Sequence, residues 1–163
     1  HFISDTLTPI MRVITQFGGT ILMILWAIAS LVLITNKRIA VSVVSNLVLI
    51  ALLNNILKLI VRRARPTGFR LITETGYSFP SGHSMVSMAF YGYLIYLIHK
   101  NVRNTKLRWT LMTGFGLLIF IIGMSRIYLG VHYTSDVFAG FLFSLGYLVV
   151  YIKMTDPIVF QKK

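Results

Sequence analysis

The chain has no cysteine and very few carboxylates. Without cysteine it has no disulfide framework, no thiol nucleophile and no zinc–cysteine site. Four acidic residues stand against 16 lysines and arginines, a net charge of +12 at pH 7. Only 12% of the residues are charged and 56% are hydrophobic, whereas soluble domains carry about 25% charged residues. The composition therefore argues against an ordinary soluble domain and is typical of a membrane protein.

The excess of positive charge indicates anionic partners, which are lipid headgroups, phosphate-bearing substrates or nucleic acid. Nucleic acid is disfavoured because the basic residues are scattered between apolar stretches and form no contiguous arm or recognised binding module. No internal repeat, low-complexity tract or sign of an obligate protein partner is evident in the sequence. We therefore expect residues 1–163 to be a single transmembrane domain in contact with the bilayer.

Five apolar stretches have the character of membrane-spanning helices. Residues 18–35 contain no charge and approach the roughly 20 residues that a bilayer core requires. Four further spans are expected at 39–61, 84–98, 109–124 and 135–152. Between Ile3 and Phe17, apolar residues recur every three or four positions, which predicts an amphipathic interfacial helix that begins near Thr8 because Pro9 follows. The expected fold class is an all-α polytopic transmembrane bundle.

Three polar segments interrupt these stretches, and the count of spans places them on one side of the membrane. KLIVRRARPTGFR (58–70) closes the second span, PSGH (80–83) opens the third, and two more spans return the chain to SRIYLGVHYTSD (125–136). The segments and the loop between them hold two acids, Glu74 and Asp136, against the cations Lys58, Arg62, Arg63, Arg65, Arg70 and Arg126. Positive charge near a bilayer core is costly without an anion beside it, so the pattern predicts a phosphate site.

Reactive groups accompany these cations. His132 and Asp136 are four residues apart, so on a continuous helical turn the carboxylate would hold one ring nitrogen as N–H and leave the other free to attack phosphorus. His83 would protonate the departing oxygen from the opposite side, and Ser81 and Gly82 would offer backbone N–H groups at a helix start. A lone His or Asp here is more often an interfacial or hydrogen-bonded residue, but the convergence of three segments favours catalysis.

A metal site is the alternative use of His83, His132 and Asp136, because two imidazoles and a carboxylate can bind zinc or iron. A divalent cation at this place would be repelled by the surrounding lysine and arginines. We therefore expect no metal and no cofactor.

The three segments resemble the signature of the type 2 phosphatidic acid phosphatase superfamily, in its integral-membrane lipid phosphatase branch. The signature reads Lys-x6-Arg-Pro, then Pro-Ser-Gly-His, then Ser-Arg-x5-His-x3-Asp, and all eleven specified positions agree. The resemblance implies that His132 forms a phosphohistidine, that Asp136 orients it and that His83 is the general acid. It also implies a set of residues that hold the phosphoryl oxygens: Lys58, Arg65, Ser81, Gly82 and Arg126.

Members of this branch usually have six transmembrane helices, with the first segment after the third helix. Here that segment follows the second apolar stretch, and the chain begins at His1 without an initiator methionine. A further helix is therefore expected upstream, which would make six spans in the full-length protein.

The resemblance implies a metal-independent phosphatase for a lipid phosphate monoester or diphosphate. Phosphatidylglycerol phosphate, phosphatidic acid and undecaprenyl diphosphate all qualify as amphiphiles whose tails stay in the bilayer. A non-enzymatic phospholipid carrier or flippase would use the same cations but has no use for a His–Asp pair opposite a second histidine. A lipid phosphotransferase, in which an alcohol replaces water as acceptor, is the other alternative.

The distribution of basic residues predicts the orientation. Nine lie away from the polar segments and seven lie on their side, of which three are reserved for phosphate. The side richer in lysine and arginine is expected to be cytoplasmic, so the site should face the extracellular or periplasmic side of a bacterial plasma membrane. The nine are Lys37, Arg38, Lys100, Arg103, Lys106, Arg108, Lys153, Lys162 and Lys163.

Overall fold

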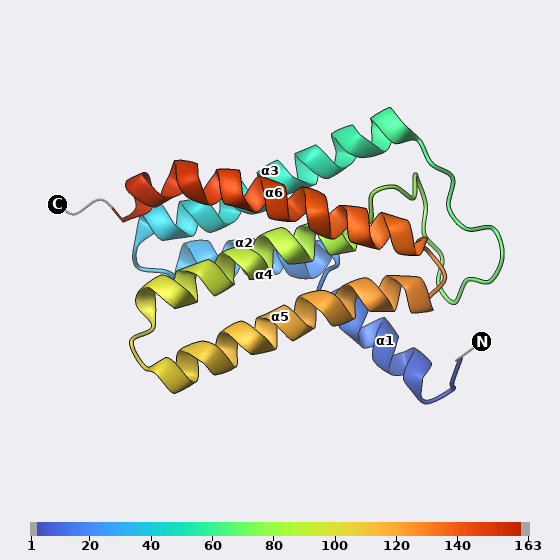
Figure 1. The fold of residues 1–163 in the computed structure, drawn as a ribbon, viewed down its shortest axis with the longest axis horizontal. Coiled ribbons are helices and arrows are strands. Elements are labelled where there is room, and N and C mark those ends of the chain that lie inside the picture. Colours follow the sequence, from blue (N-terminus) through green and yellow to red (C-terminus); the bar gives the residue numbers. More distant parts are fainter. Residues whose placement is uncertain (1–2, 161–163) are drawn as a thin grey trace.

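The structure, a computed structural model, describes residues 3–160 and is all-helical over that range (Figure 1). Its helices are α1 (Leu7–Gln16), α2 (Thr20–Leu33), α3 (Lys37–Val61), α4 (Gly82–Asn101), α5 (Thr105–Tyr128) and α6 (Thr134–Val159). The expected all-α bundle is confirmed, and each of the five apolar stretches forms a helix after the short amphipathic α1. Lys162 and Lys163, which entered the orientation argument, lie outside the described residues.

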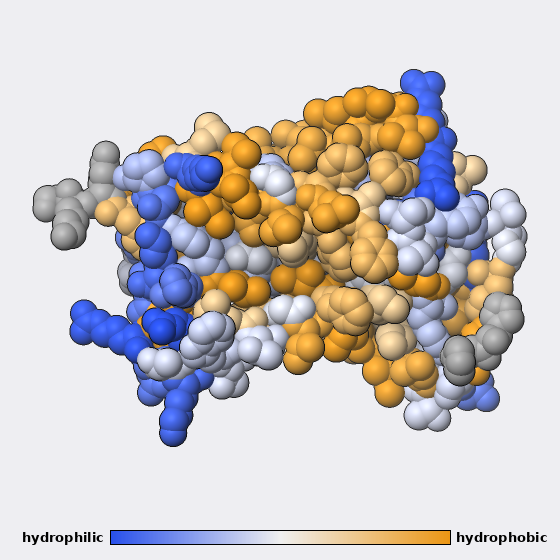
Figure 2. All heavy atoms as spheres, viewed as in Figure 1, coloured by the Kyte–Doolittle hydropathy of each residue, from blue (hydrophilic) through white to orange (hydrophobic). Residues whose placement is uncertain are grey.

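The lengths and composition of the helices suit a bilayer. Among the described residues, α3, α5 and α6 are each long and apolar enough to cross a membrane, and α1 with α2 forms a fourth candidate span, bent by 42°. Figure 2 shows hydrophobic residues across the middle of the face and hydrophilic residues gathered toward both ends. The chain is therefore an integral membrane protein.

The connection between α1 and α2 approaches α4 and α5 closely at Gly18. A Cβ atom there would lie 2.8 Å from Ile122 Cγ2 on α5 and 3.3 Å from His83 Cβ on α4. No larger residue fits without displacing these neighbours. Glycine at this position thus lets the α1–α2 connection lie close to α4 and α5.

Helix α4 lies at the centre of the bundle, in contact with α3, α5 and α6. Buried hydroxyl and amide groups join these helices: Tyr93 donates to Ser42 Oγ at 2.9 Å, and Asn46 Nδ2 donates to Ala89 O at 2.8 Å. Hydrogen bonds of this kind satisfy polar groups where lipid offers no partner. They hold α3 and α4 in register below the site.

The helices alternate in direction, so the chain returns repeatedly to the same two ends. The end of α3, the start of α4, the end of α5 and the start of α6 meet at one end, on the right in Figure 1, together with the loop 62–81. The short α2–α3 and α4–α5 connections lie at the other end. The three polar segments therefore share one end, as the count of spans predicts.

Candidate active site

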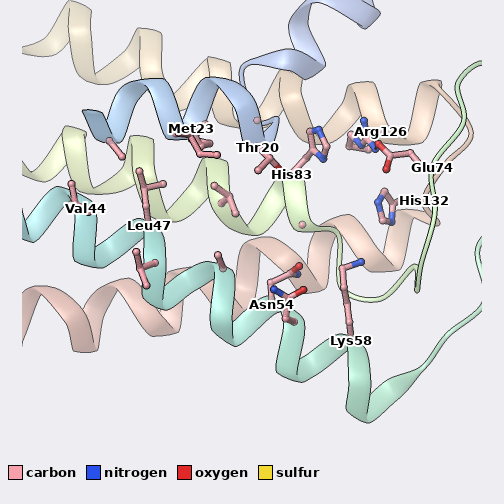
Figure 3. Close-up of a pocket in the computed structure, with 18 of the residues that line it drawn as sticks. Thr20, Met23, Val44, Leu47, Asn54, Lys58, Glu74, His83, Arg126 and His132 are labelled. Atoms are coloured by element: carbon pink, nitrogen blue, oxygen red, sulfur yellow. The ribbon is translucent and has the colours of Figure 1, made fainter. Parts of the chain in front are cut away.

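A pocket of about 460 Å³ opens at the end where the polar segments meet. Six of the eight predicted site residues line it, from three segments far apart in the sequence: Lys58, Arg65, Gly82, His83, Arg126 and His132. Figure 3 shows Lys58 reaching from α3 toward the group formed by His83, Arg126, Glu74 and His132. The tertiary structure thus brings these predicted residues together, while their chemical roles stay predictions.

His132 lies just before α6 and is 4% exposed. Its Nε2 is 3.2 Å from Arg65 Nη1, and its Nδ1 is 3.5 Å from Asp136 Oδ2. Because a guanidinium only donates, Nε2 carries the lone pair and Nδ1 the hydrogen. The lone pair of His132 therefore lies on the ring nitrogen that faces Arg65 and the other cations of the pocket.

The charges around His132 favour its neutral form. Burial lowers the pKa of His132, the hydrogen bond with Asp136 opposes this, and the charges of Arg126, Arg65 and Lys58 lower the pKa further. A neutral imidazole is the form that can attack phosphorus.

The link between His132 and Asp136 does not come from a continuous helical turn, so that interpretation of their spacing was wrong. Helix α6 begins at Thr134, and Tyr133 is an extended N-cap residue with φ −72° and ψ 153°. Asp136 Oδ2 accepts the Tyr133 N–H at 2.9 Å, and this cap turns the chain so that His132 meets the same carboxylate. The pair is held by a helix cap.

Asp136 is 0% exposed and does not line the pocket; it contacts the Nδ1 side of the His132 ring. Besides His132 and the cap N–H, its carboxylate accepts a hydrogen bond from Ser78 Oγ and pairs with Arg63 Nη1 at 2.8 Å. Sequence reasoning assigned neither Arg63 nor Ser78 a role at Asp136. Each lies two residues before a signature position, Arg65 or Pro80, which is the only signal the sequence offers.

The cations are fixed by backbone carbonyls and by one acid. Arg65 Nη1 donates to Val131 O at 3.1 Å and Nη2 donates to Thr75 O at 2.9 Å. Arg126 is 1% exposed and forms an ion pair with Glu74, whose other oxygen is 3.9 Å from Arg65 Nη2. Glu74 thus lies in the pocket between two guanidinium groups.

The start of α4 separates the two predicted backbone donors. Ser81 is the N-cap: its Oγ accepts from Ser84 N at 3.4 Å and its own N–H donates to Asp136 O at 3.1 Å. It is 0% exposed and lies behind the pocket wall, whereas Gly82 lines the pocket. A Cβ at Gly82 would lie 3.1 Å from Asn54 Oδ1, so glycine suits this contact. Of the two residues, only Gly82 lines the pocket.

The pocket continues from the cations into an apolar groove between α2 and α3. Its walls are formed by Met23, Ile24, Ala27, Val44, Leu47, Val48 and Ala51, with Val86 of α4 (Figure 3). From Lys58 back to Val44 the groove follows α3 for about 21 Å, at a rise of about 1.5 Å per residue. Sequence reasoning missed this groove because its residues belong to no motif. Among residues 3–160, no group of three or more His, Asp or Glu side chains is placed to hold a metal.

The fold and the pocket define an integral membrane protein with a cation-lined site that holds two histidines. The family model of the PAP2 superfamily matches residues 39–159, and the chain belongs to this family.

Curated and solved relatives agree with the family. The chain is 37% identical over 105 residues to phosphatidylglycerophosphatase B of Bacillus subtilis (strain 168), a match that covers 62% of this chain and 49% of the relative. It is 27% identical over 161 residues to undecaprenyl-diphosphatase of Sulfolobus acidocaldarius, covering 94% and 74%. The chain thus spans about half the length of the first relative and about three quarters of the second.

The fold also matches a solved structure. The crystal structure of a transmembrane PAP2 type phosphatidylglycerolphosphate phosphatase from Bacillus subtilis superposes with a TM-score of 0.86 at 26% identity, covering 99% of this chain and 82% of that one. The helical arrangement seen here is therefore that of a transmembrane PAP2 protein.

Proposed function

We propose that this protein is a metal-independent membrane phosphatase that removes phosphate from a lipid phosphate monoester or diphosphate. One observation carries the proposal: in a single pocket, a cation-lined end with two histidines continues into an apolar groove. A substrate that fits this pocket must combine a phosphate with a long apolar tail. The names of the relatives from Bacillus subtilis and Sulfolobus acidocaldarius denote enzymes that act on such lipids.

In the first step, His132 Nε2 attacks phosphorus in line with the leaving oxygen. The P–N bond forms, the bond from phosphorus to the lipid oxygen breaks, and His83 gives its proton to that oxygen. Asp136 stabilises the positive charge on the phosphorylated ring through Nδ1–H. The substrate phosphate takes over from Glu74 as partner of Arg65 and Arg126, and its negative charge favours protonated His83.

In the second step, water resolves the phosphohistidine. His83, now neutral, accepts a proton from water while the oxygen attacks phosphorus and the P–N bond breaks. Lys58, the two arginines and the N–H at Gly82 stabilise the charge on the phosphoryl oxygens in both steps. His132 returns to its neutral form with Nδ1 protonated.

Purified protein in one detergent, with a chelator present, tests the function. Phosphatidylglycerol phosphate, phosphatidic acid and undecaprenyl diphosphate are compared by release of inorganic phosphate. Release from at least one supports the proposal, and the relative rates identify the preferred headgroup. Binding without release would indicate a carrier or flippase, and a phosphorylated added alcohol would indicate a phosphotransferase.

The pH dependence of phosphate release follows from the environment of His132. Attack needs the neutral ring, and burial with nearby cations lowers the pKa of His132, so kcat/KM should lose activity only below the ordinary histidine pKa of about 6.5. Asp136→Asn should move this acid limb to still lower pH, because the carboxylate raises that pKa. Two substrates with different phosphate pKa values separate enzyme titration from substrate titration. An acid limb above the ordinary value would contradict the assignment.

The groove predicts a selective effect of blocking it. Ala51→Trp fills the groove between α2 and α3 and should raise KM for a long-chain lipid phosphate by about tenfold or more, since it excludes several buried methylenes. A short water-soluble phosphate ester should keep its KM. Leu52→Trp is the matched control, because Leu52 is 54% exposed and does not line the pocket. Equal effects on both substrates would argue against the groove as the tail site.

We also propose that the site faces the outside of a bacterial plasma membrane, which the excess of basic residues at the opposite end supports. The chain has no cysteine, so a single introduced cysteine is its only thiol. In intact cells, a membrane-impermeant maleimide should label Phe69→Cys, in the loop at the site, and should not label Arg103→Cys at the other end. The reverse pattern would place the site inside.

A further inference from the structure

Two side chains outside the family signature meet at the carboxylate of Asp136. Arg63 lies in the gap between Lys58 and Arg65, and its Nη1 is 2.8 Å from Asp136 Oδ1. Ser78 lies two residues before the PSGH segment and donates to Asp136 Oδ2. Its Oγ is also 3.4 Å from His132 Nδ1, so it contacts both members of the His–Asp pair.

Arg63 and Ser78 are held to each other and to the start of α6. The Ser78 N–H donates to Arg63 O at 2.8 Å, so one backbone bond joins the two residues across the loop. The Arg63 guanidinium lies 4.1 Å from the centre of the Tyr133 ring and donates to Ser135 Oγ at 2.8 Å. Contacts on several sides restrict a side chain that is still 37% exposed.

Asp136 needs these partners because its carboxylate is completely buried. A buried charge without compensation costs several kcal/mol in general, and an arginine with two further hydrogen bonds provides that compensation. His132 Nδ1 is 3.5 Å from Asp136 Oδ2, which is long for a hydrogen bond. The contact with His132 therefore does not fix the position of the carboxylate. Arg63 and Ser78, with the Tyr133 N–H, set where its oxygens lie.

Other charged groups act on His132 from every side. Lys58 approaches from α3, Arg65 from the loop, Arg126 from α5, and His83 from α4. Each of these lines the pocket and can meet the substrate, whereas Arg63 and Ser78 do not line it. Arg63 can therefore affect the reaction only through Asp136, and Ser78 can do so through Asp136 and through its contact with His132 Nδ1.

We propose that Arg63 and Ser78 are positioning residues that clamp Asp136 and thereby set the orientation and protonation of the His132 ring. The proposal rests on the proposed phosphatase function. A purely structural role, in which the two residues only tie the loop 62–81 to α6, is the competing explanation.

Arg63→Gln tests the clamp, with Arg62→Gln as matched control. The neighbouring Arg62 is exposed, and within residues 3–160 its side chain donates a hydrogen bond only to Leu59 O. Arg63→Gln should lower kcat about tenfold or more with little change in KM, since partners of a reacting group typically contribute 10- to 100-fold. It should also move the acid limb of kcat/KM to higher pH, because loss of a nearby cation favours the protonated ring. Arg62→Gln should change neither.

Further variants separate positioning from folding. Arg63→Lys keeps the charge, so its acid limb should stay in place while kcat falls less than in the glutamine variant. Ser78→Ala should lower kcat, and the Arg63→Gln/Ser78→Ala double variant should lose less than the product of the single losses, because both act on one carboxylate. Thermal unfolding in detergent reports the fold of each variant. If Arg63→Gln does not fold, the effects of Arg63→Lys and Ser78→Ala on kcat test the proposal in its place.

An unmoved acid limb in Arg63→Gln, or a change confined to KM or thermal stability, would overturn the clamp. Equal losses of kcat in the Arg62 and Arg63 variants would do the same. Neither result affects the proposed function, which depends on phosphate release by the unaltered chain.

Discussion

Replacing His132 by alanine is expected to abolish phosphate release from every lipid phosphate, with a loss of at least about 10³-fold. The substitution removes the Nε2 lone pair that faces Arg65 in the pocket. Among the described residues, His83 is the one other histidine that lines the pocket, and the chain has no cysteine that could take the place of His132. Release of inorganic phosphate under single-turnover and steady-state conditions measures the effect.

His99→Ala is the control for that experiment. His99 lies exposed in the last turn of α4, at the end of the bundle away from the site, so its loss should leave the rate unchanged. Binding of vanadate, which mimics pentavalent phosphorus, should also weaken in the His132 variant. Normal turnover in His132→Ala would remove this residue from the nucleophile role.

Replacing His83 by glutamine should produce a loss that depends on the leaving group. For a lipid alcohol, release without proton donation should be slower by about 10²- to 10⁴-fold. A nitrophenyl phosphate needs no proton on its leaving oxygen, so formation of the phosphohistidine should stay fast. Hydrolysis of the phosphohistidine should be slow, because in the proposed mechanism His83 is also the base that activates water.

The expected signature is a burst of nitrophenol equal to the amount of enzyme, with labelled phosphate retained on the protein. Phosphohistidine is identified by its lability to acid and stability to base. Equal losses for lipid and nitrophenyl substrates, with no burst, would show that His83 only helps to build the pocket. His99→Ala again serves as the matched histidine control.

The ion pair between Glu74 and Arg126 suggests how the cations of the pocket stay in place without substrate. Arg126 is almost fully buried between α1 and the loop, where it donates to Thr15 Oγ1 at 2.8 Å and pairs with Glu74. An unpaired guanidinium in that position would be costly. The carboxylate therefore provides the negative charge that the substrate phosphate would supply in the proposed reaction.

Local features of the sequence determined the broad architecture. A bilayer forces backbone polar groups into helices of a set length, so apolar runs such as 18–35 and 39–61 indicate helices without knowledge of their neighbours. The same alternation of spans places the segments around Lys58, His83 and His132 at one end. The chemistry of those residues, together with the signature that they share with a known family, then pointed to phosphate.

The atoms that meet at the site depended on the tertiary structure. Ser81 and Gly82 are adjacent in the sequence, yet only Gly82 reaches the pocket, since the N-cap role turns Ser81 toward Ser84 and Asp136. His132 and Asp136 were expected on one continuous helical turn, but α6 begins after Tyr133, which caps it, so His132 lies outside the helix. Side-chain direction at a helix start is set by the cap, which residue spacing does not specify.

The sequence by itself thus determined an all-helical membrane protein of a phosphate-handling family, because span length and residue chemistry are local properties. Only the tertiary structure decided that Glu74 lies in the pocket, that Arg63 and Ser78 hold Asp136, and that α2 and α3 enclose an apolar groove. These features arise where segments distant in the chain pack together, and their geometry depends on the angles and depths at which whole helices meet.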